Sequence, residues 1–188
     1  MAGESHSYDD VPYIGRLHTQ SHINHLAVVG TLFGLNPSPL TACRVLEVGC
    51  ADGTNLIAMA QNLPQSQFVG IDGSSKQIEV GQRMCTAVGL ANVTLIAADI
   101  HDIDPGLGDF DYIVVHGVFS WIAVETQHAL LQQCRRHLSP NGVLYISYNT
   151  YPGWHAYNQL RDMMRFHAQG MSSKQEEIEQ ARAMLQFL

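Results

Sequence analysis

Apolar runs alternate along the chain with segments in which apolar residues recur at helical spacing. Five short runs predict buried parallel strands, because a continuous apolar stretch suits a strand that is covered on both faces. The longer segments between them place apolar residues three or four positions apart, which predicts amphipathic helices. Alternating strands and helices indicate an α/β domain built on one parallel sheet. The expected strands cover residues 45–48, 67–72, 92–99, 110–116 and 143–148.

Capping residues set the expected helix boundaries. Ser74 and Gln77 form a capping-box pattern before an apolar stripe that Gly89 terminates. Ser21 can cap an earlier helix that precedes the sheet. A turn at 139–142, which contains proline, asparagine and glycine, is expected to lead into the fifth strand.

The charge balance narrows the class of partner. The chain carries ten Lys and Arg residues against seventeen Asp and Glu residues, which gives a net charge of −7. Nucleic-acid binding is therefore not expected, because phosphate neutralisation needs clustered cations. No apolar run approaches the roughly 20 residues of a membrane span, and the N-terminus lacks the basic and apolar parts of a signal peptide. We expect a cytoplasmic protein without membrane contact.

Histidines and cysteines do not form a metal-ligand pattern. His18, His22 and His25 stand at near-helical spacing, but no carboxylate or cysteine accompanies them at ligand spacing. The four cysteines are far apart and include no C-x-x-C pair. We favour a polar helix end over a metal site for these histidines, and no metal is expected.

The turn after the first strand carries the strongest signal for a ligand. A dinucleotide fingerprint needs glycine at its first, third and sixth positions, but this chain has Gly49, Ala51 and Thr54 there. A P-loop is excluded, since no Gly-Lys-Ser/Thr follows the strand. Glu47 and Asp52 would repel a pyrophosphate. Their charges suit a ligand with a positive centre and an amino group.

The pattern Glu47-x-Gly49-x-Ala51-x-Gly53 resembles motif I of the class I S-adenosylmethionine-dependent methyltransferases, with Ala51 in place of the usual middle glycine. The resemblance implies a Rossmann-like three-layer α/β sandwich with five parallel strands in this chain, and S-adenosyl-L-methionine as cofactor. It places the cofactor-binding residues at Glu47, Gly49, Ala51, Gly53, Asp72, Gly73, Asp99, Ile100 and His116.

Asp72 closes the second strand 23 residues after Gly49. A carboxylate at that place in a Rossmann-like unit accepts hydrogen bonds from ribose hydroxyls. A strand-end turn residue is the alternative for Asp72. In the resembled family, Asp99 and Ile100 hold the adenine, and the turn after His116 lies between cofactor and acceptor. A plain strand-end histidine is the equally weighted alternative for His116.

Aromatic segments narrow the resemblance. Residues 116–121 and 147–154, with Tyr8-Asp9-x-Val11-Pro12-Tyr13, resemble bacterial methyltransferases that carry a methyltransferase regulatory domain, a group that includes rickettsial protein-lysine methyltransferases. The Asp/Asn-Pro-Pro-Tyr/Phe motif of adenine and glutamine methylation is absent. The resemblance implies a protein methyl acceptor. A substrate channel, or alternatively a simple cap over the sheet, is expected from Phe119, Trp121, Tyr151 and Trp154.

We divide the chain into an N-terminal segment with an accessory helix (1–40), the cofactor-binding core (41–154) and a helical extension (155–188). A complete sheet of the family has two further strands, so the chain is expected to be the N-terminal part of a longer protein. Self-association, or contact with a missing C-terminal regulatory segment, would then cover the exposed edge. Two alternatives to an N-methylating enzyme that acts on protein lysine are a non-catalytic cofactor-binding or interaction module and a nicotinamide-dependent oxidoreductase.

Overall fold

A computed structural model describes residues 13–187, which form two compact units that divide between Tyr148 and Asn149. The part of the resemblance that rests on Tyr8, Asp9, Val11 and Pro12 lies outside the described residues. The first unit holds the sheet, and the second holds two helices.

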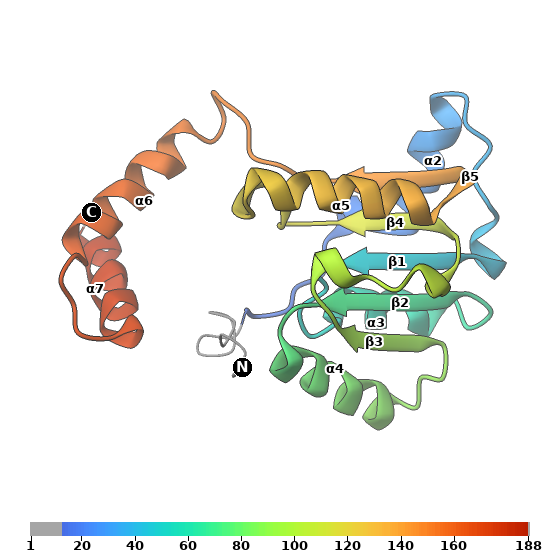
Figure 1. Cartoon of the computed structure of the whole chain (residues 1–188), viewed down its shortest axis with the longest axis horizontal. Coiled ribbons are helices and arrows are strands. Elements are labelled where there is room, and N and C mark those ends of the chain that lie inside the picture. The colour runs from blue at the N-terminus through green and yellow to red at the C-terminus, as the bar shows by residue number, and fades with distance from the viewer. Residues whose placement is uncertain (1–12, 188) are drawn as a thin grey trace. The chain divides into compact units, whose positions relative to one another are not determined.

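Five parallel strands form one sheet, as the sequence predicted. Their order in the sheet is β3-β2-β1-β4-β5 (Figure 1). The central strand is β1. The chain places β2 and β3 on one side of β1 and then crosses to place β4 on the other side, so the loops after β1 and β4 diverge. Such a switch point is where open α/β sheets bind ligands. The strands are β1 (Arg44–Val48), β2 (Gln67–Asp72), β3 (Val93–Ala97), β4 (Phe110–Val115) and β5 (Leu138–Ile146).

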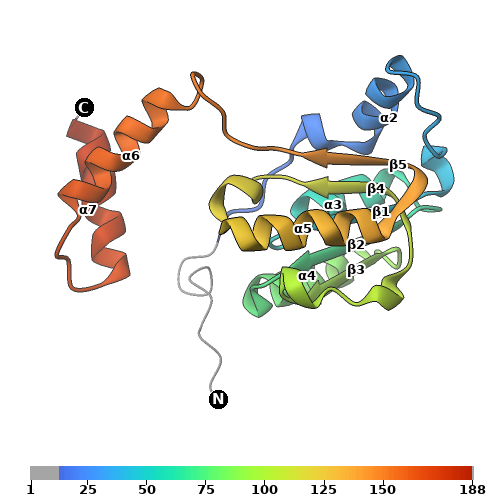
Figure 2. The same ribbon diagram turned by 45° about the horizontal axis from the view of Figure 1, so that its top comes forward.

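Helices cover both faces of the sheet. Figures 1 and 2 show α5 on one face and α3 on the other. The helices of the first unit are α2 (Ile23–Leu32), α3 (Thr54–Asn62), α4 (Ser75–Val88) and α5 (Val124–His137). Short 3-10 helices lie at Thr19–Ser21, Leu40–Ala42, Ile100–Asp102, Pro105–Leu107 and Phe119–Trp121.

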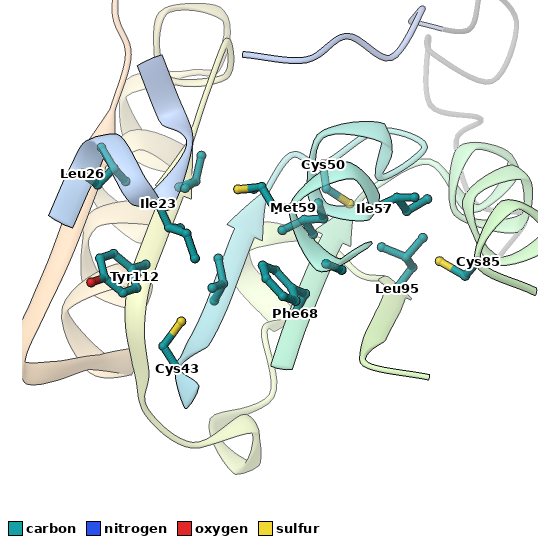
Figure 3. Close-up of a cluster of buried hydrophobic side chains, with 14 of the residues drawn as sticks. Ile23, Leu26, Cys43, Cys50, Ile57, Met59, Phe68, Cys85, Leu95 and Tyr112 are labelled. Carbon is teal, nitrogen blue, oxygen red and sulfur yellow. The ribbon is translucent and has the colours of Figure 1, made fainter. Parts of the chain in front are cut away.

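The core forms two apolar clusters, one on each face of the sheet. In the cluster of Figure 3, Ile23 of α2 and Met59 of α3 pack with Phe68 of β2. On the opposite face, Leu130 and Cys134 of α5 are fully buried against the strands. Each helix therefore buries the apolar stripe that its sequence period predicts.

The predicted cap of α4 is present, whereas that of α2 is wrong. Ser74 Oγ accepts a hydrogen bond of 3.2 Å from the Gln77 N–H, and α4 ends at Gly89 with a φ of 76°. The N-cap of α2 is His22, whose Nδ1 accepts the Asn24 N–H. Ser21 does not cap α2, because its hydroxyl donates to the His18 carbonyl and accepts from Asn55 Nδ2.

The expected turn at 139–142 lies inside β5. Residues Phe110 and Tyr112 of β4 pair with Leu138 and Val143 of β5, so the segment between the latter two forms an irregularity in the ladder. A strand can accommodate such extra residues as a bulge, so a proline–glycine pattern does not by itself end it.

The second unit consists of α6 (His155–His167) and α7 (Lys174–Phe187), which contact each other. Tyr151 and Trp154 precede α6, and Trp154 stacks on Tyr157 with ring centroids 4.8 Å apart. Within residues 13–187, no helix is both long and apolar enough to cross a membrane.

Candidate functional site

A cavity of about 230 Å³ lies at the carboxyl ends of the strands, around the switch point between β1 and β4. A single water needs about 10–15 Å³ by this measure, so the space suits an organic ligand. Its lining comes from the loops after four strands and from the segment before α2: Tyr13, Gly15, Arg16, His18, Glu47, Val48, Gly49, Cys50, Ala51, Asp52, Thr54, Asn55, Ile71, Asp72, Gly73, Gln77, Ala98, Asp99, Ile100, His116, Gly117, Val118, Trp121 and Ile122.

The loop after β1 depends on small residues with left-handed backbone conformation. Gly49 has a φ of 76°, and a Cβ there would lie 2.2 Å from Val118 Cγ2. Ala51, with a φ of 51°, is the one non-glycine residue of positive φ in the described part of the chain. An L-residue pays roughly 1–2 kcal/mol for this conformation, so alanine keeps the loop shape at a cost in stability.

Asp72 at the end of β2 holds this loop in place. Its Oδ2 accepts a hydrogen bond of 2.8 Å from the Ala51 N–H, and its Oδ1 accepts one of 2.9 Å from the Ser74 N–H. Each carboxylate oxygen has capacity for a second donor. Asp72 can therefore accept ribose hydroxyls while it ties the turn after β1 to the start of α4.

Glu47 is a buried carboxyl group with one oxygen unpartnered. Its side chain is 3% exposed, Oε1 accepts a hydrogen bond of 2.9 Å from Asn55 Nδ2, and Oε2 has no partner among the described residues. Burial raises the pKa of Glu47 to about 7, although the Asn55 hydrogen bond works in the opposite direction. Because Glu47 belongs to the cavity lining, a cationic donor in the cavity would stabilise the charged form of its carboxyl group.

His116 follows β4 and has ring partners on two sides. Its Nδ1 lies 3.3 Å from Tyr145 Oη, and its ring centroid lies 3.8 Å from that of His18. Burial, and to a smaller degree His18, lowers the pKa of His116 below its usual value of 6.5. The imidazole is therefore neutral at pH 7 and can accept a proton.

The segment before α2, residues 13–18, forms part of the cavity wall, and we call it the N-terminal strap. The Gln77 side chain donates to the Tyr13 carbonyl oxygen at 3.2 Å, and the His18 N–H donates to Asn55 Oδ1 at 3.2 Å. Gly15 lies so close to Asp52 that a Cβ would come within 2.2 Å of Oδ1. No local pattern in the sequence indicates this role, because each of these three contacts joins residues more than 30 positions apart.

A family model described as a methyltransferase domain matches residues 46–144, more than half of the chain. This chain belongs to that family. The predicted resemblance to class I S-adenosylmethionine-dependent methyltransferases is thereby confirmed, and the oxidoreductase alternative is wrong. The carboxylates around the cavity suit a cationic ligand better than a pyrophosphate.

Two curated relatives come from Rickettsia prowazekii (strain Madrid E). The chain is 41% identical over 97% of its length to uncharacterized protein RP028 and covers 73% of that protein. It is 40% identical over 96% of its length to uncharacterized protein RP789, of which it covers 33%.

A solved structure matches over nearly the whole chain. The structure of PKMT2 from Rickettsia typhi in complex with AdoHcy has a TM-score of 0.84 and 41% identity, over 94% of this chain and 34% of PKMT2. The chain thus spans about a third of PKMT2 and of RP789. Its fold is the Rossmann-like methyltransferase fold.

Most of the predicted site residues line the cavity together. Of the nine cofactor-binding predictions, eight are in the lining: Glu47, Gly49, Ala51, Asp72, Gly73, Asp99, Ile100 and His116. Gly53 lies outside it, at the N-cap of α3 with a φ of 71°, and packs beside Leu95. Direct contact of Gly53 with a ligand remains a prediction.

The four channel predictions fall in different places. Trp121 lines the cavity, whereas Phe119 lies outside the lining, with its ring edge-on to Tyr148. Tyr151 and Trp154 belong to the second unit. Their part in a substrate channel remains a prediction.

Proposed function

We propose that the cavity binds S-adenosylmethionine and that this domain methylates lysine side chains of proteins. The observation that carries the cofactor assignment is the unpartnered Oε2 of buried Glu47 at the switch point of the sheet. A buried carboxylate of this kind needs a cationic donor, and the ammonium group of the cofactor provides one. The complex of PKMT2 with AdoHcy supports the same assignment.

The residues of the cavity fit the parts of this cofactor. Asp72 would accept the ribose hydroxyls, while Asp99 and Ile100 would hold the adenine. Gly49 and Ala51 keep the backbone free of bulky side chains where the ligand passes. When bound, the cofactor supplies a methyl group on a cationic sulfur, and the four carboxyl groups of the lining are compatible with that charge.

His116 would prepare the acceptor. A lysine amine has a reference pKa of about 10.4 and must lose a proton before it can act as a nucleophile. The neutral imidazole of His116 lies in the cavity lining and can take that proton, with Tyr145 Oη holding the ring through Nδ1. Trp121 supplies an apolar wall that favours the uncharged amine.

Two further observations support a lysine-bearing protein as acceptor. The chain resembles a group that includes protein-lysine methyltransferases in residues 116–121 and 147–154. Its net charge of −7 attracts basic substrates.

Cofactor binding is tested by calorimetry with S-adenosylhomocysteine, which lacks the reactive methyl group. We expect wild type to bind and Asp72→Ala to lose at least tenfold in affinity. Asp109→Asn is the matched control. Asp109 lies just before β4, at the amino end of the strand, whereas the cavity lies at the carboxyl ends. Unchanged affinity in Asp72→Ala would contradict the assignment of this residue.

The acceptor is tested by incubating the domain with labelled cofactor and a bacterial lysate, followed by mass spectrometry of methylated peptides. We expect label on lysine, and none when the lysate amines are first blocked by exhaustive acetylation. Label on another side chain would refute the lysine assignment. Tight cofactor binding with no transfer to any protein would favour the non-catalytic module.

A further inference from the structure

Among the residues that the structure describes, the cavity lining contains one permanently charged cation, and its position is set by the N-terminal strap. The described lining includes four carboxyl residues, Glu47, Asp52, Asp72 and Asp99, together with the guanidinium residue Arg16 and two histidines. It includes no lysine from the range 13–187. Arg16 is therefore the strongest candidate in this cavity to recognise an anionic group of a ligand.

The strap holds Arg16 against the loop after β1. Tyr13 and His18, which flank it, are tied by hydrogen bonds to Gln77 of α4 and to Asn55 of α3. Its neighbour Gly15 touches Asp52, where no side chain would fit. These contacts fix the backbone of Arg16 relative to Glu47, whose Oε1 binds the same Asn55 side chain.

Arg16 is an exposed residue of the cavity lining. Its charge contributes, after burial, to lowering the pKa of His18, whose ring centroid lies 3.8 Å from that of His116. The side chain of Arg16 forms no ion pair or hydrogen bond with another residue of the range 13–187.

We propose that Arg16 binds the α-carboxylate of the cofactor's amino-acid end, opposite the ammonium site at Glu47; this rests on the proposed function. The ammonium and carboxylate groups are attached to the same carbon atom. A ligand whose ammonium reaches Glu47 Oε2 must therefore place its carboxylate within a few ångström of that point. A guanidinium fork matches a carboxylate with two parallel hydrogen bonds.

The competing donors for that carboxylate are backbone N–H groups at the start of α3. The first of these, the Thr54 N–H, already donates to Asp52 Oδ1 at 3.0 Å. The Asp52 carboxylate occupies this helix terminus and opposes a second anion there. It leaves Arg16 as the stronger partner.

The test compares two ligands that differ only in the carboxylate, S-adenosylhomocysteine and its decarboxylated analogue, which keeps the amine. Calorimetry is carried out on the 188-residue chain as wild type, as Arg16→Gln and as Arg83→Gln. Arg83 is an exposed residue of α4 outside the cavity lining, which makes it the matched control.

We expect Arg16→Gln to lower the affinity for S-adenosylhomocysteine at least tenfold and the affinity for the decarboxylated analogue less than twofold. The reason is that a charge-assisted pair is lost only with the first ligand. Arg83→Gln should change neither affinity. Equal losses for both ligands would reduce Arg16 to a support of the strap and overturn the proposal. Unchanged affinity for both would assign the carboxylate to the backbone. Failure of wild type to bind either ligand would instead refute the proposed function.

Discussion

The side-chain amide of Asn55 donates a hydrogen bond of 2.9 Å to Glu47 Oε1, and the other oxygen of this buried carboxyl group has no partner among residues 13–187. One hydrogen bond does not compensate a carboxylate for complete removal from water. The pKa of Glu47 is therefore raised to about 7 by burial. The ionised carboxylate of Glu47 therefore lowers the stability of the ligand-free domain. It becomes favourable when a ligand places a cationic group beside it.

Glu47→Gln should stabilise the ligand-free domain at high pH. Because the folded-state pKa is raised from 4.5 to about 7, the stability contributed by the bound proton is complete below pH 4.5 and lost as the pH rises through 7. Glutamine keeps the Asn55 hydrogen bond and carries no charge. The gain over wild type should be on the order of 3 kcal/mol at pH 8 and near zero at pH 4.5, measured by urea unfolding.

The same variant should bind the cofactor less well, because an amide cannot pair its charge with the ammonium group. At pH 8 we expect the affinity for S-adenosylhomocysteine to fall at least tenfold, opposite to the change in stability. Asp109→Asn, which removes one carboxylate outside the cavity, is the control and should change neither quantity. A stability gain that does not depend on pH would contradict the raised pKa of Glu47.

Ala51→Gly should stabilise the loop after β1. Ala51 has a φ of 51°, which costs an L-residue roughly 1–2 kcal/mol and glycine nothing, while glycine adds entropy to the unfolded chain. We expect a net gain of about 0.5–1 kcal/mol in thermal or urea unfolding. Ala58→Gly, inside α3, is the matched control and should lose about 1 kcal/mol. A loss at both positions would mean that Ala51 is not strained.

Gly49→Ala should destabilise the domain through a steric clash and an unfavourable backbone angle. The new Cβ would lie 2.2 Å from Val118 Cγ2, and the φ of 76° is unfavourable for alanine. Together these effects should cost roughly 2–4 kcal/mol. Val118→Ala introduced into the Gly49→Ala background should recover part of the loss, and a double-mutant cycle measures the coupling. Strict additivity of the two substitutions would rule out this clash.

His18→Gln should raise the pKa of His116. Burial lowers that pKa first, and the neighbouring His18 lowers it further, so removing the second ring removes one cause and exposes the first ring to water. An NMR titration of the imidazole Cε1–H resonances measures the change, with exposed His25 as internal reference. A pKa of His116 that stays the same or falls would show that the His18 ring does not act on the His116 proton.

The lowered pKa of His116 also gives the sign of its effect on folding. Its contribution is fully present above the unfolded-state value of 6.5 and is lost as the pH falls through the lower folded-state value. Glu47 acts in the opposite direction between pH 4.5 and 7. Comparing Glu47→Gln with His116→Gln over this range separates the two groups, since each variant removes one of the opposing slopes.

Local patterns predicted the strand positions within a few residues, because each buried strand is a continuous apolar run bounded by turn residues. They failed where a distant partner decides the local structure. Ser21 has the right chemistry for an N-cap, but its hydroxyl donates to the His18 carbonyl and lies 3.4 Å from Asn55 Nδ2, so His22 caps α2. Likewise, pairing with β4 draws residues 139–142 into β5.

The sequence alone determined the α/β class, the family and the acidic loop after β1, since these depend on periodicity and on residue types at fixed short spacings. The tertiary structure decided which residues complete the cavity. Arg16 and His18 share the cavity lining with Glu47 and His116 only because the strap is tied to Asn55 and Gln77, 37 and 64 positions away along the chain. Contacts over such separations come from folding and leave no periodic signal in the order of residues.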